Sequence, residues 1–276
     1  MDIRDYRAID VHAHYGSYLR AGNTDLQNEM ATGDAETVVA RARRARTDWT
    51  VVSPLLGLLP RGEADAAEGN REASRIIPQT DGLLQWVIID PLRPETYEQA
   101  IDALPEAHCM GIKIHPEEHV YPISEHGDAI FSFAAEHRAF VLVHSGDPYS
   151  LPDDFLVFGE RYPEATILLA HLGNGGGAGG DPTTQVRAIQ ASTQGNLYVD
   201  TSSARSIMPK LVEWAVEEIG ADRILYGTDT PLYSAEMQRA RIDHAEISEA
   251  DKKLILRDNA VTLLDLPTSN QGQPAS

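Results

Sequence analysis

Eight short apolar runs recur along the 276-residue chain, and helical stretches separate them. Most runs are nearly continuous in Val, Ile and Leu, which is typical of parallel strands buried on both faces. The runs are AIDVHAH, WTVVSPLL, LLQWVIIDP, CMGIKIHP, AFVLVHSG, TILLAHLG, NLYVDTSS and RILYGTDTP. Eight strand–helix units predict a (β/α)8 TIM barrel, an α/β fold of about 250 residues. A doubly wound open sheet is the alternative, but such a sheet rarely needs eight regular units.

The segments between the runs supply the crossover helices of this barrel. Capping residues and helical periodicity predict helices at residues 34–48, 66–77, 94–107, 124–137, 153–162 and 207–219. A closing helix is expected at residues 249–264, and the polar tail 267–276 is expected to be disordered. No linker divides the chain, so we predict a single barrel domain over residues 1–266.

Charge and cysteine content exclude several classes of function. The chain carries 23 basic and 42 acidic residues, a formal charge of −19, which disfavours nucleic acid and anionic lipid as partners. Cys109 is the only cysteine, so neither an internal disulfide nor a thiolate cluster can form. The opening residues lack a leader pattern and no run is long enough to span a membrane, which predicts a soluble cytoplasmic protein. A small-molecule substrate is expected, and a homo-oligomer is left open.

Titratable side chains gather at the carboxyl ends of five predicted strands. His12 and His14 alternate along the first run, so both imidazoles leave the same face of an extended strand. Each histidine taken alone is as often a structural residue as a ligand, but the joint placement indicates an active site at one end of the barrel. The full set is His12, His14, Lys113, His115, His144, His171 and Asp229.

The order of these motifs resembles the amidohydrolase superfamily. HxH on the first strand is followed by GIKIHP, VLVHSG, ILLAHLG and ILYGTDTP, and the closing LRDNAVTLLDL resembles the terminal helix of the family. The similarity covers residues 9–266. The more closely similar branch is amidohydrolase family 2, which includes lactonases and aromatic-acid decarboxylases.

The resemblance implies one divalent metal ion bound by His12, His14, His144 and Asp229. It also implies that His171 contacts the attacking water or the substrate, and that Asp229 doubles as the group that accepts and returns a proton. Imidazoles with one carboxylate suit zinc, and manganese is the alternative. The predicted catalytic residues are therefore Asp229 and His171.

Lys113 has two interpretations. In some amidohydrolases a lysine on the fourth strand is carboxylated and bridges two metal ions, which would make this a two-metal site. The plainer hypothesis, which we favour, is that Lys113 binds a substrate carboxylate or carbonyl as a cation. The weaker candidates for substrate contact are His115, His119, Tyr121 and Ser202.

The stretch LGNGGGAGGD places Gly175, Gly177 and Gly180 in the spacing of a dinucleotide fingerprint, with Asp200 about twenty residues further on. We interpret it as a mobile loop near the entrance, because Asp181 and Pro182 make a better helix start than the glycines do. No nucleotide cofactor is therefore expected.

Three functions compete at this stage. The leading hypothesis is a hydrolase that attacks a small-molecule amide, lactone or ester-like bond with metal-activated water. A non-oxidative decarboxylase of a small carboxylic acid is the alternative, and a non-catalytic barrel that binds a metal or ligand is the third. Few long insertions are present to build a deep aromatic-acid pocket, and for that reason hydrolysis is favoured.

Overall fold

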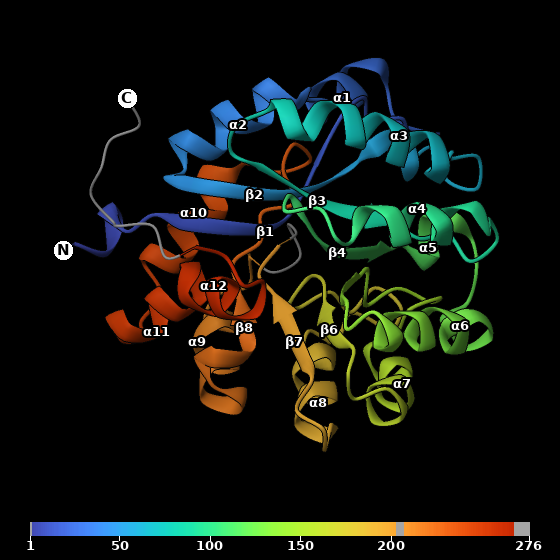
Figure 1. Cartoon of the computed structure of the whole chain (residues 1–276). Coiled ribbons are helices and arrows are strands. Elements are labelled where there is room, and N and C mark those ends of the chain that lie inside the picture. Colours follow the sequence, from blue (N-terminus) through green and yellow to red (C-terminus); the bar gives the residue numbers. More distant parts are fainter. Residues whose placement is uncertain (1, 203–206, 268–276) are drawn as a thin grey trace.

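Eight parallel strands form the barrel in the computed structural model, which describes residues 2–202 and 207–267 (Figure 1). The strands pair in chain order from β1 to β8, and every neighbouring pair is parallel. They are β1 (Ala8–Tyr15), β2 (Thr47–Pro54), β3 (Leu83–Ile88), β4 (Cys109–Ile114), β5 (Phe140–Val143), β6 (Thr166–Leu169), β7 (Leu197–Asp200) and β8 (Ile224–Leu225). The eight predicted strands and the single-domain barrel fold are thus confirmed.

The barrel is closed by hydrogen bonds between β1 and the chain that follows β8. The amide of Val11 donates to the carbonyl of Tyr226 at 2.9 Å, and the amide of Asp229 donates to the carbonyl of His12 at 2.7 Å. β8 itself is only two residues long because the backbone after Leu225 turns toward β1. This turn brings Asp229 beside the two histidines of β1.

Helices surround the strands, as Figure 1 shows. They are α1 (Asp25–Met30), α2 (Ala35–Arg44), α3 (Ala66–Ile76), α4 (Glu95–Ala103), α5 (Pro116–His119), α6 (Ile123–Glu136), α7 (Leu156–Arg161), α8 (Thr184–Ala191), α9 (Leu211–Ile219), α10 (Ala235–Asp243), α11 (Glu249–Lys253) and α12 (Asn259–Leu263). The expected cap of the helix after β1 is present, because the Asp34 carboxylate accepts a hydrogen bond from the Thr37 amide.

Several helix boundaries differ from the predictions for local reasons. α2 ends at Arg44 rather than near residue 48, because Arg46 takes a left-handed backbone conformation before β2. α9 begins only after Lys210, which is also left-handed. The closing helix is interrupted by a π-helical turn, Leu254–Asp258, between α11 and α12. The helices α1, α5 and α10 were not predicted. The expected disorder of the tail concerns residues that lie almost wholly outside the described part.

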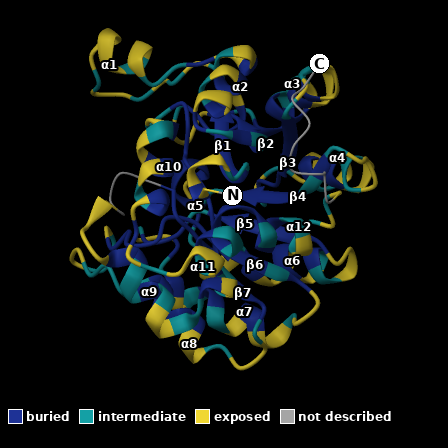
Figure 2. Cartoon of the chain, turned by 90° about the vertical axis from the view of Figure 1, so that its left-hand side faces the viewer, coloured by how far each residue is buried: buried dark blue, intermediate teal, exposed yellow. Residues whose placement is uncertain are grey.

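The core has two layers, one inside the barrel and one between the strands and the helices. Trp86 lies in the inner layer, fully buried, and its indole N–H donates to the carbonyl of Val11 at 2.8 Å. Ile112 and Ile114 of β4 point outward instead, into a cluster that includes Phe131 of α6. Figure 2 shows this division as buried strands and helices with exposed outer faces. Strands buried on both faces explain the continuous apolar runs.

None of the helices in the described ranges is long and apolar enough to cross a membrane.

The close packing of α6 predicts that one methyl group added at Gly127 lowers the stability of the protein. A Cβ added at Gly127 would lie 2.1 Å from the Phe158 ring, so Gly127→Ala should reduce the free energy of unfolding by about 1–3 kcal/mol through overpacking. This loss should exceed the helix-propensity gain of about 1 kcal/mol. Ser132→Ala at an exposed position of α6 is the matched control. Denaturant unfolding measures both variants, and a Gly127→Ala protein as stable as the parent would contradict the packing described here.

Candidate active site

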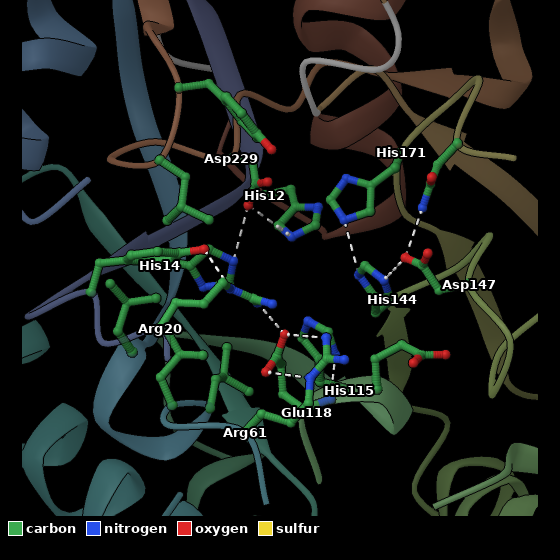
Figure 3. A pocket seen from close by; sticks show the side chains of 18 of the residues that line it. His12, His14, Arg20, Arg61, His115, Glu118, His144, Asp147, His171 and Asp229 are labelled. Atoms are coloured by element: carbon green, nitrogen blue, oxygen red, sulfur yellow. Dashed lines mark hydrogen bonds and ion pairs between the residues drawn. The ribbon is translucent and has the colours of Figure 1, made fainter. Parts of the chain in front are cut away.

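A cavity of about 410 Å³ opens at the carboxyl end of the strands (Figure 3). Its wall combines titratable groups with apolar and aromatic side chains from the segments that follow β1, β2, β4, β5, β6 and β8. The titratable lining residues are His12, His14, Tyr18, Arg20, Arg61, His115, Glu117, Glu118, His144, Asp147, His171, Asp229 and Tyr233. The predicted strand ends therefore do meet at one cavity.

His12, His14 and Asp229 form a compact group in the floor of this cavity. The Asp229 Oδ1 atom lies 3.1 Å from Nε2 of His14 and 3.7 Å from Nε2 of His12. All three residues are buried, and one ligand atom from each lies within 4.8 Å of the other two. Asp229 has a φ of 58°, and this left-handed backbone, uncommon for a residue with a side chain, accompanies the turn toward β1.

Hydrogen bonds on the far side of both imidazoles fix their orientation. His12 Nδ1 lies 2.8 Å from the Asp200 carboxylate, and His14 Nδ1 lies 3.1 Å from the carbonyl oxygen of Ser53. Since these partners are acceptors, each Nδ1 donates a hydrogen bond, which leaves each Nε2 facing Asp229 and the cavity. Metal-binding histidines are characteristically held in this way.

The electrostatics of the group disfavour a charged His12 and favour an ionised Asp229. Burial and the charge of Lys113 lower the pKa of His12 to about 4. Burial alone would raise the pKa of Asp229, but the His14 hydrogen bond and the nearby imidazoles hold it well below its ordinary value. Two imidazoles and one ionised carboxylate make a donor set that fits a divalent cation.

A second group of possible ligands, His12, His171 and Asp200, is already satisfied within the protein. The hydroxyl oxygen of Ser202 lies 2.8 Å from His171 Nδ1 and 3.0 Å from His12 Nδ1, and this hydroxyl donates to Asp200. We therefore interpret this group as the support of the site rather than as a metal centre. Ser202, a predicted substrate contact, lies in this support.

Lys113 reaches the metal-ligand group from β4. Its side chain is fully buried, and Nζ lies 3.2 Å from Nε2 of His12. Burial lowers the pKa of the Lys113 ammonium to about 8. The position is compatible with either interpretation of this lysine, as a cation for the substrate or as a carboxylated ligand.

His144 lies to one side of the three-residue group. Its Nδ1 is 3.1 Å from His171 Nε2, and its Nε2 is 2.8 Å from the Asp147 carboxylate. The ring also stacks on His115, with 4.1 Å between the centroids. His144 and His171 both line the cavity, but the structure does not bring His144 into the group of His12, His14 and Asp229. Its role as a metal ligand stays a prediction.

The predicted substrate contacts separate into two sets. His115 lines the cavity, whereas His119 and Tyr121 do not. His119 is buried with Nε2 2.8 Å from the carbonyl oxygen of Gly57, and Tyr121 is buried in the layer outside the barrel. Val120, left-handed at the end of α5, lies between them. The structure thus places these two residues behind the cavity wall.

Several residues of the site were not predicted. Asp200 ends the seventh apolar run, and its position at a strand end was a usable signal, although it was considered only as part of the dinucleotide pattern. Asp147 and Ser53 also follow or end strands. Arg20 and Arg61 come from loops, where no periodicity or motif marks them.

The glycine-rich segment is a loop that precedes α8, as expected. A Cβ at Gly175 would lie 2.1 Å from the Asp181 carbonyl oxygen, and one at Gly177 would lie 2.7 Å from the Asp147 backbone. Gly179 and Gly180 have open space around them. α8 begins at Thr184 rather than at Asp181, whose carboxylate caps the Thr183 amide. The glycines therefore do not surround a helix terminus, and loop mobility stays a prediction.

The barrel and its His/Asp group define the general class of protein, and sequence comparison gives the family. The chain belongs to the amidohydrolase family, whose sequence model matches residues 9–266. This confirms the resemblance drawn from the strand-end motifs.

Individual relatives are decarboxylases. A gamma-resorcylate decarboxylase of Polaromonas sp. (strain JS666 / ATCC BAA-500) is 32% identical over 127 residues, 39% of this chain and 36% of that protein. The match to this curated relative thus spans about a third of its length.

Two solved structures have a similar fold. The dihydroxybenzoic acid decarboxylase from Polaromonas sp. JS666, with bound manganese and 2-nitroresorcinol, has a TM-score of 0.70 at 16% identity and covers 94% of this chain and 97% of its own. The 5-carboxyvanillate decarboxylase from Novosphingobium aromaticivorans, complexed with manganese, has a TM-score of 0.68 at 16% identity, with coverages of 95% and 96%.

The three-residue group predicts the metal content of the protein. We expect about one divalent ion per chain after purification without chelators, measured by elemental analysis, and loss of that ion in His14→Ala. Two ions per chain, with the second lost in Lys113→Met, would instead support the carboxylated-lysine interpretation. Protein that neither retains nor takes up a divalent ion would contradict the metal site.

The hydrogen bond between His12 and Asp200 predicts an effect on the affinity for the metal ion. Asp200→Asn should weaken metal binding by about 10- to 100-fold, because the amide no longer fixes the imidazole orientation as the carboxylate does. Competition with a chelating dye measures the affinity, and Asp181→Asn is the control, because the Asp181 carboxylate bonds Thr183 and Arg187 rather than a candidate ligand. Unchanged affinity in Asp200→Asn would show that the His12–Asp200 bond does not support a metal ligand.

Proposed function

We propose that this protein is a metal-dependent, non-oxidative decarboxylase of a small carboxylic acid, with hydroxylated aromatic acids as the first class to test. One observation carries the proposal: the His/Asp group lies in a cavity whose wall is partly apolar and aromatic. Those lining residues are Tyr18, Leu55, Leu58, Leu59, Leu232 and Tyr233. Such a wall suits a flat ring whose acid group lies at the polar floor.

The decarboxylase relatives support the same choice over the hydrolysis favoured earlier. That preference depended on the shortage of long insertions for an aromatic pocket. The segment after β2 nevertheless supplies Leu55, Leu58 and Leu59, all at most 5% exposed, without a long insertion. The gamma-resorcylate and 5-carboxyvanillate decarboxylases act on aromatic acids by name, and we extend that substrate class to this chain.

His12, His14 and Asp229 would hold the metal ion, and we propose manganese because it is the ion in the two solved relatives. When bound, the ion supplies positive charge that binds the acid group and stabilises the negative charge left on the substrate. Lys113 adds a cation beside His12. His144 and His171 line the same cavity and orient the substrate from the opposite strands.

Decarboxylation needs one proton at the carbon that loses the carboxylate. The C–C bond breaks, its electron pair stays on the ring carbon, carbon dioxide leaves, and a proton takes its place. We assign this proton transfer to Asp229, with His171 beside it, because both are buried titratable groups that face the cavity floor. The Asp229 carboxylate first takes up a proton from solvent water and then delivers it to carbon.

Hydrolysis stays the second candidate because of one observation. The ionised Asp229 carboxylate lies in the metal-ligand group, where it is placed to accept a proton from water. The same residues would then serve an amide, lactone or ester-like substrate.

Product analysis separates the two functions. Manganese-loaded and zinc-loaded protein is incubated with a panel of ortho-hydroxybenzoates and with a panel of lactones and aryl esters. We expect release of carbon dioxide from members of the first panel and, in D2O, one deuterium at the carbon that lost the carboxylate. Hydrolysis of the second panel without any carbon dioxide from the first would overturn the decarboxylase proposal.

The role of Asp229 predicts a selective loss of turnover. Asp229→Asn should lower kcat by about 10²- to 10⁴-fold with a modest change in KM, because proton transfer is lost while the amide oxygen still approaches the ion. Metal content should fall far less than in His12→Ala. A kcat within a few-fold of the parent would show that Asp229 does not transfer the proton.

A further inference from the structure

Two arginines share one buried carboxylate at the side of the cavity. Nη2 of Arg61 lies 3.0 Å from Oε1 of Glu118 and Nε of Arg61 lies 3.2 Å from Oε2, while Arg20 Nη2 bonds the same Oε1. The Glu118 side chain is 4% exposed, whereas those of Arg20 and Arg61 are 37% and 50% exposed. Figure 3 shows both arginines meeting at Glu118, on the far side of His14 from Asp229.

This cluster carries a net positive charge and has hydrogen-bond donors to spare. Two guanidinium groups against one carboxylate leave a formal charge of +1. Burial alone would raise the pKa of Glu118, but the hydrogen bonds from Arg61 and the charge of Arg20 lower it, so the carboxylate is ionised. Within the described residues, the hydrogen bonds of the arginines use Nε and Nη2, and Nη1 of each has no protein acceptor.

The other carboxylates near the arginines, Glu117 and Asp147, act on Arg61 through their charge, while their hydrogen-bond partners lie elsewhere. Glu117 accepts a hydrogen bond from the Tyr149 amide, and Asp147 is bonded by His144 and Asn174. If Glu118 served only to hold the neighbouring loops together, a single arginine bonded to it would be enough. Here both line the cavity, in a chain whose charge of −19 repels anions. The pair adds positive charge to one side of the cavity wall.

We infer that Arg20 and Arg61 form a binding subsite for a second anionic group of the substrate, so that the preferred substrates are dicarboxylic acids. This inference rests on the proposed function: one carboxylate lies at the metal-ligand group and the other at the arginines. Each free Nη1 can donate to a carboxylate oxygen, and charge-assisted bonds of this kind are the stronger ones. Glu118 holds the two guanidinium groups in place and is a positioning residue.

The test compares binding of two unreactive ligands that differ by one carboxylate. Isophthalate and benzoate are titrated calorimetrically into the full-length, manganese-loaded protein, its Arg61→Met and Arg61→Lys variants, and Arg43→Met. Arg43 lies on α2 in an exposed ion pair with Asp81, outside the cavity, and is the matched control. We expect isophthalate to bind roughly tenfold or more tightly than benzoate to the parent and to Arg43→Met.

Arg61→Met should remove most of this preference while benzoate binding stays unchanged. Arg61→Lys should keep part of it, since the charge remains and the planar fork is lost. The preference should also shrink as sodium chloride rises, because both arginines are partly exposed. Thermal unfolding checks that each variant is folded. If Arg61→Met does not fold, the binding preference of Arg61→Lys decides whether the subsite exists.

Equal binding of the two ligands by the parent, or an equal loss for both ligands in the Arg61 variants, would overturn the subsite. The proposed function fails separately. A retained preference for isophthalate without carbon dioxide release from any acid would leave the subsite standing and remove the decarboxylase assignment. If acids with and without a second carboxylate are decarboxylated equally well, the decarboxylase assignment would stand and the subsite would be overturned.

Discussion

The hydrogen bond between His12 and Asp200 connects the fold of this protein to its site. Asp200 ends β7 and His12 lies on β1, so the 2.8 Å bond crosses the place where the barrel closes. The same carboxylate group also accepts from the amides of His171 and Ser202. A buried, ionised acid thereby orients one candidate metal ligand and anchors two neighbouring strand ends. The contact that orients His12 thus lies at the closure of the barrel.

The parts of the structure that could be predicted from the sequence are those with a local signal. Each strand is a short apolar run, and burial of both faces makes such runs distinct from the amphipathic helices between them. His12 and His14 share a face because strands have a period of two. Their meeting with Asp229 followed from the rule that parallel strands place their carboxyl ends together. Helix ends were less predictable, since left-handed residues such as Arg46 and Lys210 carry no strong sequence mark.

The unpredicted parts depend on contacts between residues far apart in the chain. Arg61 and Glu118 are 57 positions apart, and His12 and Asp200 are 188 apart. His119 and Tyr121 also follow the fourth strand, in the segment that begins with His115, yet of the three only His115 lines the cavity. What separates them is the short helix α5 and the left-handed Val120 after it. Proximity to a strand end therefore selects candidates, and loop conformation decides among them.

The choice between decarboxylation and hydrolysis depends on the cavity wall more than on the metal-ligand group. Two imidazoles and a carboxylate around a divalent ion serve either reaction, since both require positive charge and a proton carrier at the same place. The reactions differ in what must fit: a hydrolase has to admit water beside the scissile bond, whereas a decarboxylase has to exclude it from the carbon that is protonated. Leu55, Leu58 and Leu59 line the cavity with apolar surface, and the arginines face its side. In the proposed complex the leucines would contact the ring of the substrate, and the polar residues of the wall would contact its acid groups.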